Sequence, residues 1–148
     1  MDNKFVIAVL VSNISGVLSR VSGMFTRRGF NIDSLTVGET ESSGFSRITI
    51  SFHGDDDIKE RIFQQLKKLH DVREVEVLNA NETVIRELLL IKVRNKPESR
   101  QDVMTAVEIF RSKIDAFIEL LKPCGIMEMC RTGIVAVERG DNCLKTVK

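Results

Sequence analysis

Residues 5–77 switch repeatedly between two hydrophobic periods, and this alternation limits the possible folds more than any other feature of the chain. The unbroken apolar run Phe5–Val11 predicts a strand that is buried on both faces. After a break at Asn13–Gly16, apolar residues recur at helical spacing over residues 17–28. Gly29 then stands where a helix commonly ends. The chain therefore opens with a strand followed by an amphipathic helix.

The next four elements complete a known arrangement. Ile32–Val37 predicts a strand, and the turn Glu41–Gly44 separates it from a strand of period two at Arg47–Phe52. A helix follows through Leu69, and Glu74–Val77 predicts the last strand. The order strand, helix, strand, strand, helix, strand is that of the ferredoxin-like fold, in the α+β class, with both helices on one face of an antiparallel sheet. We expect no cover within the chain for the other face, which would then need a partner.

A second half begins after a short polar linker. Residues 1–79 form the first predicted domain, residues 80–83 the linker and residues 84–148 the second domain. The second domain looks like a shortened repeat of the first, because it has a predicted strand at Val84–Val93, a helical region and closing apolar runs but no middle hairpin. Between Val103 and Leu121 the apolar residues are spaced by four and three without interruption, which predicts one amphipathic helix of about 22 residues, Ser99–Lys122.

Composition excludes several classes of function. The formal net charge is +1, which argues against nucleic acid or a membrane surface as a partner. The seven-residue run Phe5–Val11 is too short to span a membrane, and no cleavage signal follows it. Three cysteines, an odd number without a secretory signal, indicate reduced thiols. We therefore expect a cytoplasmic protein.

No catalytic or metal-binding pattern stands out. The sequence has no nucleophile elbow, no phosphate-binding loop and no zinc-protease motif. His53 and His70 are isolated and predict surface residues, and the cysteine spacing matches no zinc site. Asp55–Asp57 could bind a divalent cation, but three acids before a helix also cap it and complement its dipole. We expect no catalytic residue, no metal and no cofactor in this chain.

The turn Asn13–Val17 is the one place where local chemistry points to a ligand. It joins a buried strand to a helix N-terminus, whose free backbone N–H groups favour an anion. Gly16 removes a Cβ where a ligand could approach the backbone, and the Asn13 amide can meet an ammonium or a carboxylate group. A simpler alternative is a capped turn with Asn13 or Ser15 as the N-cap residue, and both interpretations stay open here.

Longer motifs along the chain resemble one known family, the small subunit of acetolactate (acetohydroxyacid) synthase. The most specific of them is Arg28–Val37. A generic ACT domain would share only the fold and the glycine turn with this chain. The resemblance covers nearly the whole chain and implies that the first domain is an ACT domain, a ferredoxin-like amino-acid sensor. The motifs that carry it are residues 13–21, 25–38, 46–50, 108–111 and 131–136.

The resemblance implies a regulatory subunit of branched-chain amino-acid biosynthesis that is not itself an enzyme. Family members form ACT dimers that bind a branched-chain amino acid, usually valine, for feedback inhibition. They also activate a large catalytic subunit that holds thiamine diphosphate, Mg²⁺ and usually FAD. An ACT module that regulates another metabolic enzyme is the alternative. The effector residues carried over are Asn13, Ser15, Gly16, Val17 and Leu18 of one chain, with Asn31 and Ile32 of the other.

One departure from the family lies in the second half. Family members usually have about twenty more residues near Arg111, enough for the two middle strands of the domain. Here Arg111 runs directly into Ser112. The resemblance therefore leaves two alternatives: the C-terminal domain lacks its middle hairpin, or a segment of the protein is absent from the printed sequence.

Overall fold

The computed structural model describes residues 3–94, 96–98, 100–110, 113–141 and 143–144. The chain divides into two compact units, one made of residues 1–85 with 133–148 and the other of residues 86–132. The C-terminal residues thus belong with the N-terminal unit, whereas the sequence analysis grouped them with the second half. Each unit has its own strands and helices.

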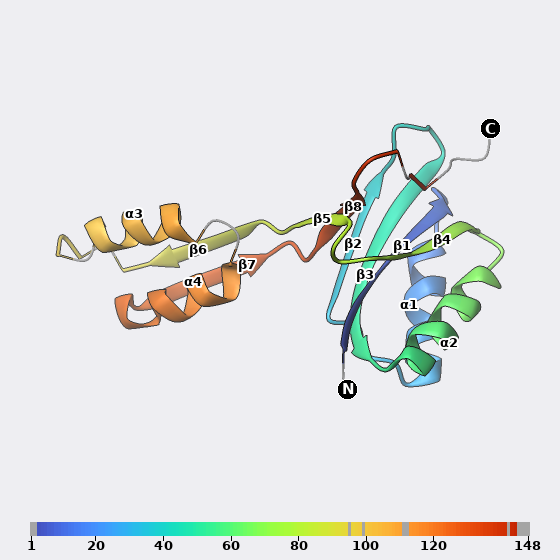
Figure 1. Cartoon of the computed structure of the whole chain (residues 1–148), viewed down its shortest axis with the longest axis horizontal. Helices are drawn as coiled ribbons and strands as arrows, with labels where there is room; N and C mark the ends of the chain where they lie inside the picture. The colour runs from blue at the N-terminus through green and yellow to red at the C-terminus, as the bar shows by residue number, and fades with distance from the viewer. Residues whose placement is uncertain (1–2, 95, 99, 111–112, 142, 145–148) are drawn as a thin grey trace. The chain divides into compact units, whose positions relative to one another are not determined.

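The first unit contains a four-stranded antiparallel sheet with two helices on one face (Figure 1). The strand order is β2-β3-β1-β4, which confirms the predicted ferredoxin-like arrangement. A separate two-stranded sheet joins β5 and β8. In chain order the elements are β1 (Asn3–Ser12), α1 (Val17–Arg28), β2 (Ser34–Glu39), β3 (Phe45–Gly54), α2 (Asp56–Lys67), β4 (Val72–Leu78), β5 (Thr83–Arg86) and β8 (Val135–Glu138).

The core of this unit lies between the sheet and the two helices. Strand β1 is buried along most of its length, as its unbroken apolar run predicted. Phe25 of α1 and Phe52 of β3 meet edge to face, with 6.4 Å between ring centroids. Ile62 and Leu66 carry the buried face of α2 onto the same cluster. The two helical periods in the sequence therefore place their apolar residues on the sheet.

The second face of the sheet is covered by the chain's own C-terminal residues, so the prediction that it lacks cover is wrong. Ile134 and Ala136 are buried against Val6, Ala8 and Leu78 on this face. These residues lie far from the sheet in sequence and were assigned to the second domain. Nothing local in residues 1–79 indicates that a distant segment returns to them.

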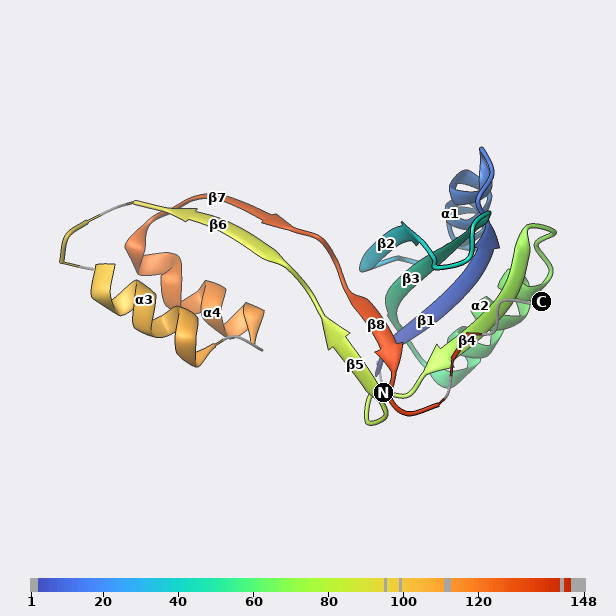
Figure 2. The same cartoon turned by 90° about the horizontal axis from the view of Figure 1, so that it is seen from above.

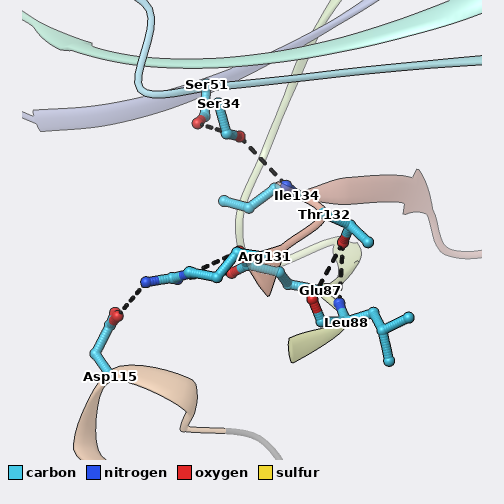
Figure 3. A network of polar contacts seen from close by, with 8 residues as sticks. All are labelled: Ser34, Ser51, Glu87, Leu88, Asp115, Arg131, Thr132 and Ile134. Atoms are coloured by element: carbon cyan, nitrogen blue, oxygen red, sulfur yellow. Dashed lines mark hydrogen bonds and ion pairs between the residues drawn. The ribbon is translucent and has the colours of Figure 1, made fainter. Parts of the chain in front are cut away.

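Polar side chains of the sheet fasten the returning segment (Figure 3). The Ser34 hydroxyl accepts a hydrogen bond from the Ile134 N–H at 3.2 Å, and the Thr36 hydroxyl donates to the Ile134 carbonyl at 2.6 Å. Arg47 Nη2 donates to the Ala136 carbonyl at 2.8 Å. These backbone N–H and carbonyl groups of the returning segment thereby gain hydrogen-bond partners that burial against the sheet would otherwise deny them.

The second unit contains a two-stranded antiparallel sheet, and two helices lie on one face of it (Figures 1 and 2). Strand pairing runs from Leu89 opposite Arg131 to Val93 opposite Ile126. Arg131 fastens this sheet to a helix, because its guanidinium contacts both oxygens of Glu87 and one oxygen of Asp115, each at 2.7 Å (Figure 3). The elements are β6 (Leu89–Val93), α3 (Arg100–Ile109), α4 (Ile114–Leu121), the 3₁₀ turn η1 (Lys122–Cys124) and β7 (Ile126–Arg131).

Two of the predicted elements in this region are wrong. The single helix Ser99–Lys122 is instead two helices, because α3 ends at Ile109 and α4 begins at Ile114. Lys113 has φ −127° and ψ 70°, outside the helical region. Ser99 and residues 111–112, over which the long helix was also predicted, lie outside the described residues. The predicted strand at residues 84–93 likewise divides into β5 and β6.

A glycine before β8 allows its close approach to the sheet, and substitution should reveal the cost. Gly133 has φ +86°, and a Cβ there would lie 3.3 Å from both Ser34 Cβ and Thr36 Cγ2. We expect Gly133→Ala to lower the free energy of unfolding by about 2 kcal/mol, from backbone strain and this contact together.

Gly140→Ala is the matched control, because Gly140 also has positive φ but nothing lies within 4 Å of its added Cβ. Chemical denaturation of the two variants should show the larger loss at Gly133. Equal losses would contradict the inferred close packing of this segment on β2.

Candidate functional site

The predicted ligand-binding turn forms the exposed N-terminus of α1. Gly16 is the N-cap residue, in a left-handed conformation with φ 86° and ψ −7°. No side chain caps this helix end, and the first turn contains no acidic residue. The alternative of a turn capped by Asn13 or Ser15 is therefore wrong. The first turn of α1 presents backbone N–H groups that no side chain occupies, and such groups favour an anion.

Asn13 connects this turn to the edge of the sheet. Its backbone N–H donates to the Gly44 carbonyl at 2.7 Å, and its side-chain Nδ2 donates to Glu39 Oε1 at 3.0 Å. Glu39 is the last residue of β2, which is an edge strand of the sheet. The bond to Glu39 orients the amide, so its oxygen points away from that carboxylate.

Of the other residues of the turn, one is buried in the core and two are exposed to solvent. Val17 is buried and holds the first turn of α1 on the core. Ser15 is exposed, and Leu18 is 42% exposed. Five of the predicted effector residues, from Asn13 to Leu18, thus lie together around one helix end.

Asn31 and Ile32 lie at the opposite end of α1. Ile32 packs against the core and Asn31 is exposed, both in the segment between α1 and β2. The helix has 12 residues, which corresponds to about 18 Å. One chain therefore does not bring these two residues to the Gly16 turn.

The sequence analysis missed a cluster of charges beneath β8. Cavities of about 210 and 440 Å³ lie on the second face of the sheet, and Arg47 lines both of them. Burial lowers the pKa of Arg47, while Glu76, Glu138 and Glu41 counteract the shift. Burial also raises the pKa of Glu76, and a hydrogen bond to Glu138 raises it further. The position of Arg47 in a period-two strand places it opposite the core, but only the return of β8 buries it.

The remaining candidate residues have structural roles. Asp55 is the N-cap of α2 and accepts a hydrogen bond from the Ile58 N–H at 2.8 Å, so the capping interpretation of the acidic run is confirmed. His53 Nδ1 lies 2.5 Å from an oxygen of Asp33, and its side chain is 48% exposed. His70 is exposed, as predicted. These residues do not converge on a site for acid–base chemistry.

The described ranges contain neither a cluster of metal-binding side chains nor a helix that could span a membrane. Among those residues, no group of three or more His, Cys, Asp or Glu side chains could hold a metal ion. No helix in the same ranges is long and apolar enough to cross a membrane. The cytoplasmic location stays a prediction.

Fold and turn together define a class. An antiparallel β2-β3-β1-β4 sheet with two helices on one face, and a glycine turn between β1 and α1, is an ACT-type domain. Residues 7–74 match the family model described as the "AHAS small subunit-like ACT domain". Residues 86–114 and 111–140 match the model described as "Small subunit of acetolactate synthase".

Individual relatives agree with these matches. A probable acetolactate synthase small subunit from Methanothermobacter thermautotrophicus is 43% identical over 159 residues, which cover 94% of this chain and 95% of the relative. The acetolactate synthase small subunit of Bacillus subtilis is 42% identical and covers 93% of this chain and 91% of the relative. The crystal structure of the small subunit from Thermotoga maritima has a TM-score of 0.84 at 39% identity, covering 95% of this chain and 99% of that one.

The chain belongs to the family of acetolactate synthase small subunits, as its motifs indicated. This membership supports a regulatory role over the alternative of an ACT module that serves another enzyme. The alignment to the Methanothermobacter relative is longer than the 148 residues of this chain, so that relative has residues that this chain lacks. The second family model also matches in two pieces, which overlap at residues 111–114, after the end of α3 and up to the first residue of α4.

The Glu76 carboxyl should make the stability of the first unit depend on pH. Its pKa is raised in the folded state, so the folded chain keeps a proton that the unfolded chain releases as pH rises above ~4. Stability is therefore lost as pH rises from the unfolded pKa to the raised folded pKa. We expect Glu76→Gln to raise the Tm by a few degrees at pH 7 and to change it little at pH 4.

Thermal melting at both pH values checks this prediction. Glu82→Gln is the control for removal of one negative charge, because Glu82 is exposed and is not among the groups that shift the pKa of Glu76. A Tm difference between Glu76→Gln and the unmodified chain that is the same at pH 4 and pH 7 would contradict the assigned ionisation.

Proposed function

We propose that this chain is the regulatory subunit of an acetolactate synthase in the biosynthesis of valine, isoleucine and leucine. Its ACT domains form a homodimer and bind a branched-chain amino acid, valine, at their interface. Bound valine inhibits the enzyme by feedback, and the chain also activates a large catalytic subunit. The contact between the Gly16 turn and the end of β2 carries this proposal.

The geometry of β2 explains how two chains would complete one site. Asn13 is hydrogen-bonded to Glu39 at the C-terminal end of β2, whereas Asn31 and Ile32 lie three and two residues before its N-terminal end at Ser34. The outer edge of β2 has no strand partner in the described part of the chain. If two β2 edges pair antiparallel, the N-terminal end of one strand lies beside the C-terminal end of the other. Asn31 of one chain then lies near Asn13 and Gly16 of the other.

The exposed apolar surface supports the same interface. Residues 3–85, all of them described, expose three large hydrophobic side chains: Ile14 at 52%, Leu18 at 42% and Val37 at 45%. Two of these flank the Gly16 turn, and the third lies on β2. Apolar side chains gathered at a free strand edge and a binding turn are typical of an interface that another chain and a ligand cover.

Valine has the chemistry that this turn would recognise. Its carboxylate would accept hydrogen bonds from the free N–H groups of α1, each contributing about 1.5–3 kcal/mol. Its ammonium group would donate to the Asn13 amide oxygen, and its isopropyl group would be buried near Leu18, for roughly 1.5–3 kcal/mol. Immobilisation of the ligand offsets part of these contributions.

Catalysis is assigned to the large subunit. In this proposal the large subunit holds thiamine diphosphate, Mg²⁺ and FAD. Thiamine diphosphate would supply the carbon–carbon bond chemistry, and Mg²⁺ would supply the positive charge that binds its diphosphate group. This chain's own part is to bind the effector and to contact the catalytic subunit.

Complementation between two defective variants tests the shared site. Gly16→Asp and Asn31→Ala should each abolish valine binding in a homodimer, because each removes one side of both sites. Dimers reconstituted from an equal mixture should recover about a quarter of the normal stoichiometry, since half of them are mixed and each mixed dimer keeps one intact site. Titration calorimetry with valine measures this stoichiometry.

Folding must be controlled in this test, because Gly16 has positive φ and any side chain there is strained by about 1–2 kcal/mol. A Cβ at Gly16 would also lie 3.1 Å from Arg20 Nη1. Gly125→Asp is the matched control, because Gly125 has positive φ and its added Cβ would lie 3.1 Å from Arg94 Cδ; this variant should bind valine normally. Folded variants whose mixture binds no valine would exclude a site shared between chains, as would undiminished binding by Gly16→Asp alone.

A reconstitution assay tests the regulatory role. The chain alone should form no acetolactate, and its addition to the large subunit should increase the rate of acetolactate formation. Valine should then lower that rate, and Asn31→Ala should remove the valine effect while the activation persists. An unchanged large-subunit rate at saturating small subunit would contradict the proposal.

A further inference from the structure

One edge of strand β6 has no strand partner among the described residues, whereas its counterpart in the first unit is paired on both sides. In the first unit, β1 precedes the first helix and pairs with β3 on one side and β4 on the other. In the second unit, β6 precedes α3 in the same way but pairs with β7 alone, as far as the chain is described. The position that β3 fills beside β1 has no counterpart beside β6.

We propose that this edge pairs with β6 of a second copy of the chain. Antiparallel pairing of two β6 strands would give a four-stranded sheet in the order β7-β6-β6-β7. A two-fold axis perpendicular to the sheet would keep the helices of both copies on one face. This interface is separate from the β2 edge and does not depend on the proposed effector site.

The second unit is too thinly packed to leave this edge open. Among the described residues of this unit only Ala106 and Leu121 are buried. A two-stranded sheet is marginally stable by itself, and at least three strands with an apolar face are needed for independent stability. Pairing with a second copy would add a strand to the sheet from residues that the chain already has.

The surface beside the edge is apolar. Helix α3 lies on the β6 side of the sheet and α4 on the β7 side (Figures 1 and 2). Met104 and Val107 of α3 are 58% and 44% exposed. Because α3 of the second copy would extend over the joined sheet from the other side of the axis, these side chains would gain an apolar neighbour.

The sequence of β6 is complementary to itself in one register. Leu89, Ile91 and Val93 are half-buried toward the helices, while Leu90 and Lys92 point to the open face. Residues opposite each other in an antiparallel pair point to the same face of the sheet. The two-fold axis that relates the two β6 strands must therefore pass through a residue, because an axis between two residues would pair side chains that point to opposite faces. An axis at Ile91 pairs all five residues and sets Leu90 against Lys92 of the second copy. An axis at Lys92 would set two lysines together.

A lysine on an edge strand often prevents such pairing, but Lys92 does not oppose it here. Its ammonium group lies 2.9 Å from Glu128 Oε2 on the neighbouring strand β7. That contact holds the side chain over the sheet that is already formed. Placed against Leu90 of the second copy, it meets no like charge.

Substitutions of Leu90 test both the pairing and its register. Leu90 is 63% exposed, so Leu90→Lys and Leu90→Glu should both fold. The first places a lysine against Lys92 of the second copy, and the second places a glutamate there. Hydrogen exchange by mass spectrometry reports residues 89–93 and 34–39 separately in the full chain, so association through β6 is distinguished from association through β2.

In the unmodified chain, exchange over residues 89–93 should slow roughly tenfold or more as the protein concentration is raised from submicromolar to about 100 µM. Leu90→Glu should keep this protection, and Leu90→Lys should lose it without changing exchange in β7 at low concentration. Exchange over residues 89–93 that is independent of concentration would overturn the proposal. Protection of residues 89–93 that arises only when the large subunit is added would also overturn the proposal, because the large subunit and not a second copy would then pair with the edge of β6.

Discussion

The hydrogen bonds between β2 and the segment leading into β8 are the contact on which the organisation of the first unit depends. Ser34 and Thr36 bind the two backbone groups of Ile134, and Gly133 allows the approach. The same strand supplies the edge for the proposed dimer and ends at Glu39 beside the Asn13 turn. Within six residues β2 therefore has one face that packs Leu35 against the core, one face that receives β8, and an outer edge with no strand partner among the described residues.

This arrangement suggests why two distant motifs of the family occur together. The stretch Arg28–Val37 and the stretch Gly133–Ala136 meet on one face of the sheet, where the hydroxyls of Ser34 and Thr36 bind the backbone groups of Ile134. Arg47, from a third motif on β3, donates to the Ala136 carbonyl. Under the proposed function, a change in β2 on ligand binding would reach β8 through these bonds. β8 is joined to β7 through residues 132–134, so the first unit is covalently continuous with the second at this point.

Local periodicity predicted the ferredoxin-like order of the first six elements, because each apolar face in residues 5–77 is complete within its own element. The turn at Gly16 was also predictable, since strand-to-helix glycine turns have a local signature. The cover of the sheet by Ile134 and Ala136 was not, because it joins residues about 100 positions apart in sequence. The break between α3 and α4 was missed for a related reason. The spacing of apolar residues indicates that each segment is helical, but it does not indicate that α4 reverses direction and packs on α3.

The shared effector site is tested most directly by a crystal structure of the chain grown with valine. The valine carboxylate should lie at the N-terminus of α1 of one protomer, with Asn31 of the partner protomer in contact with the same ligand across paired β2 strands. Valine bound elsewhere, or held entirely by residues of a single protomer, would contradict the assignment.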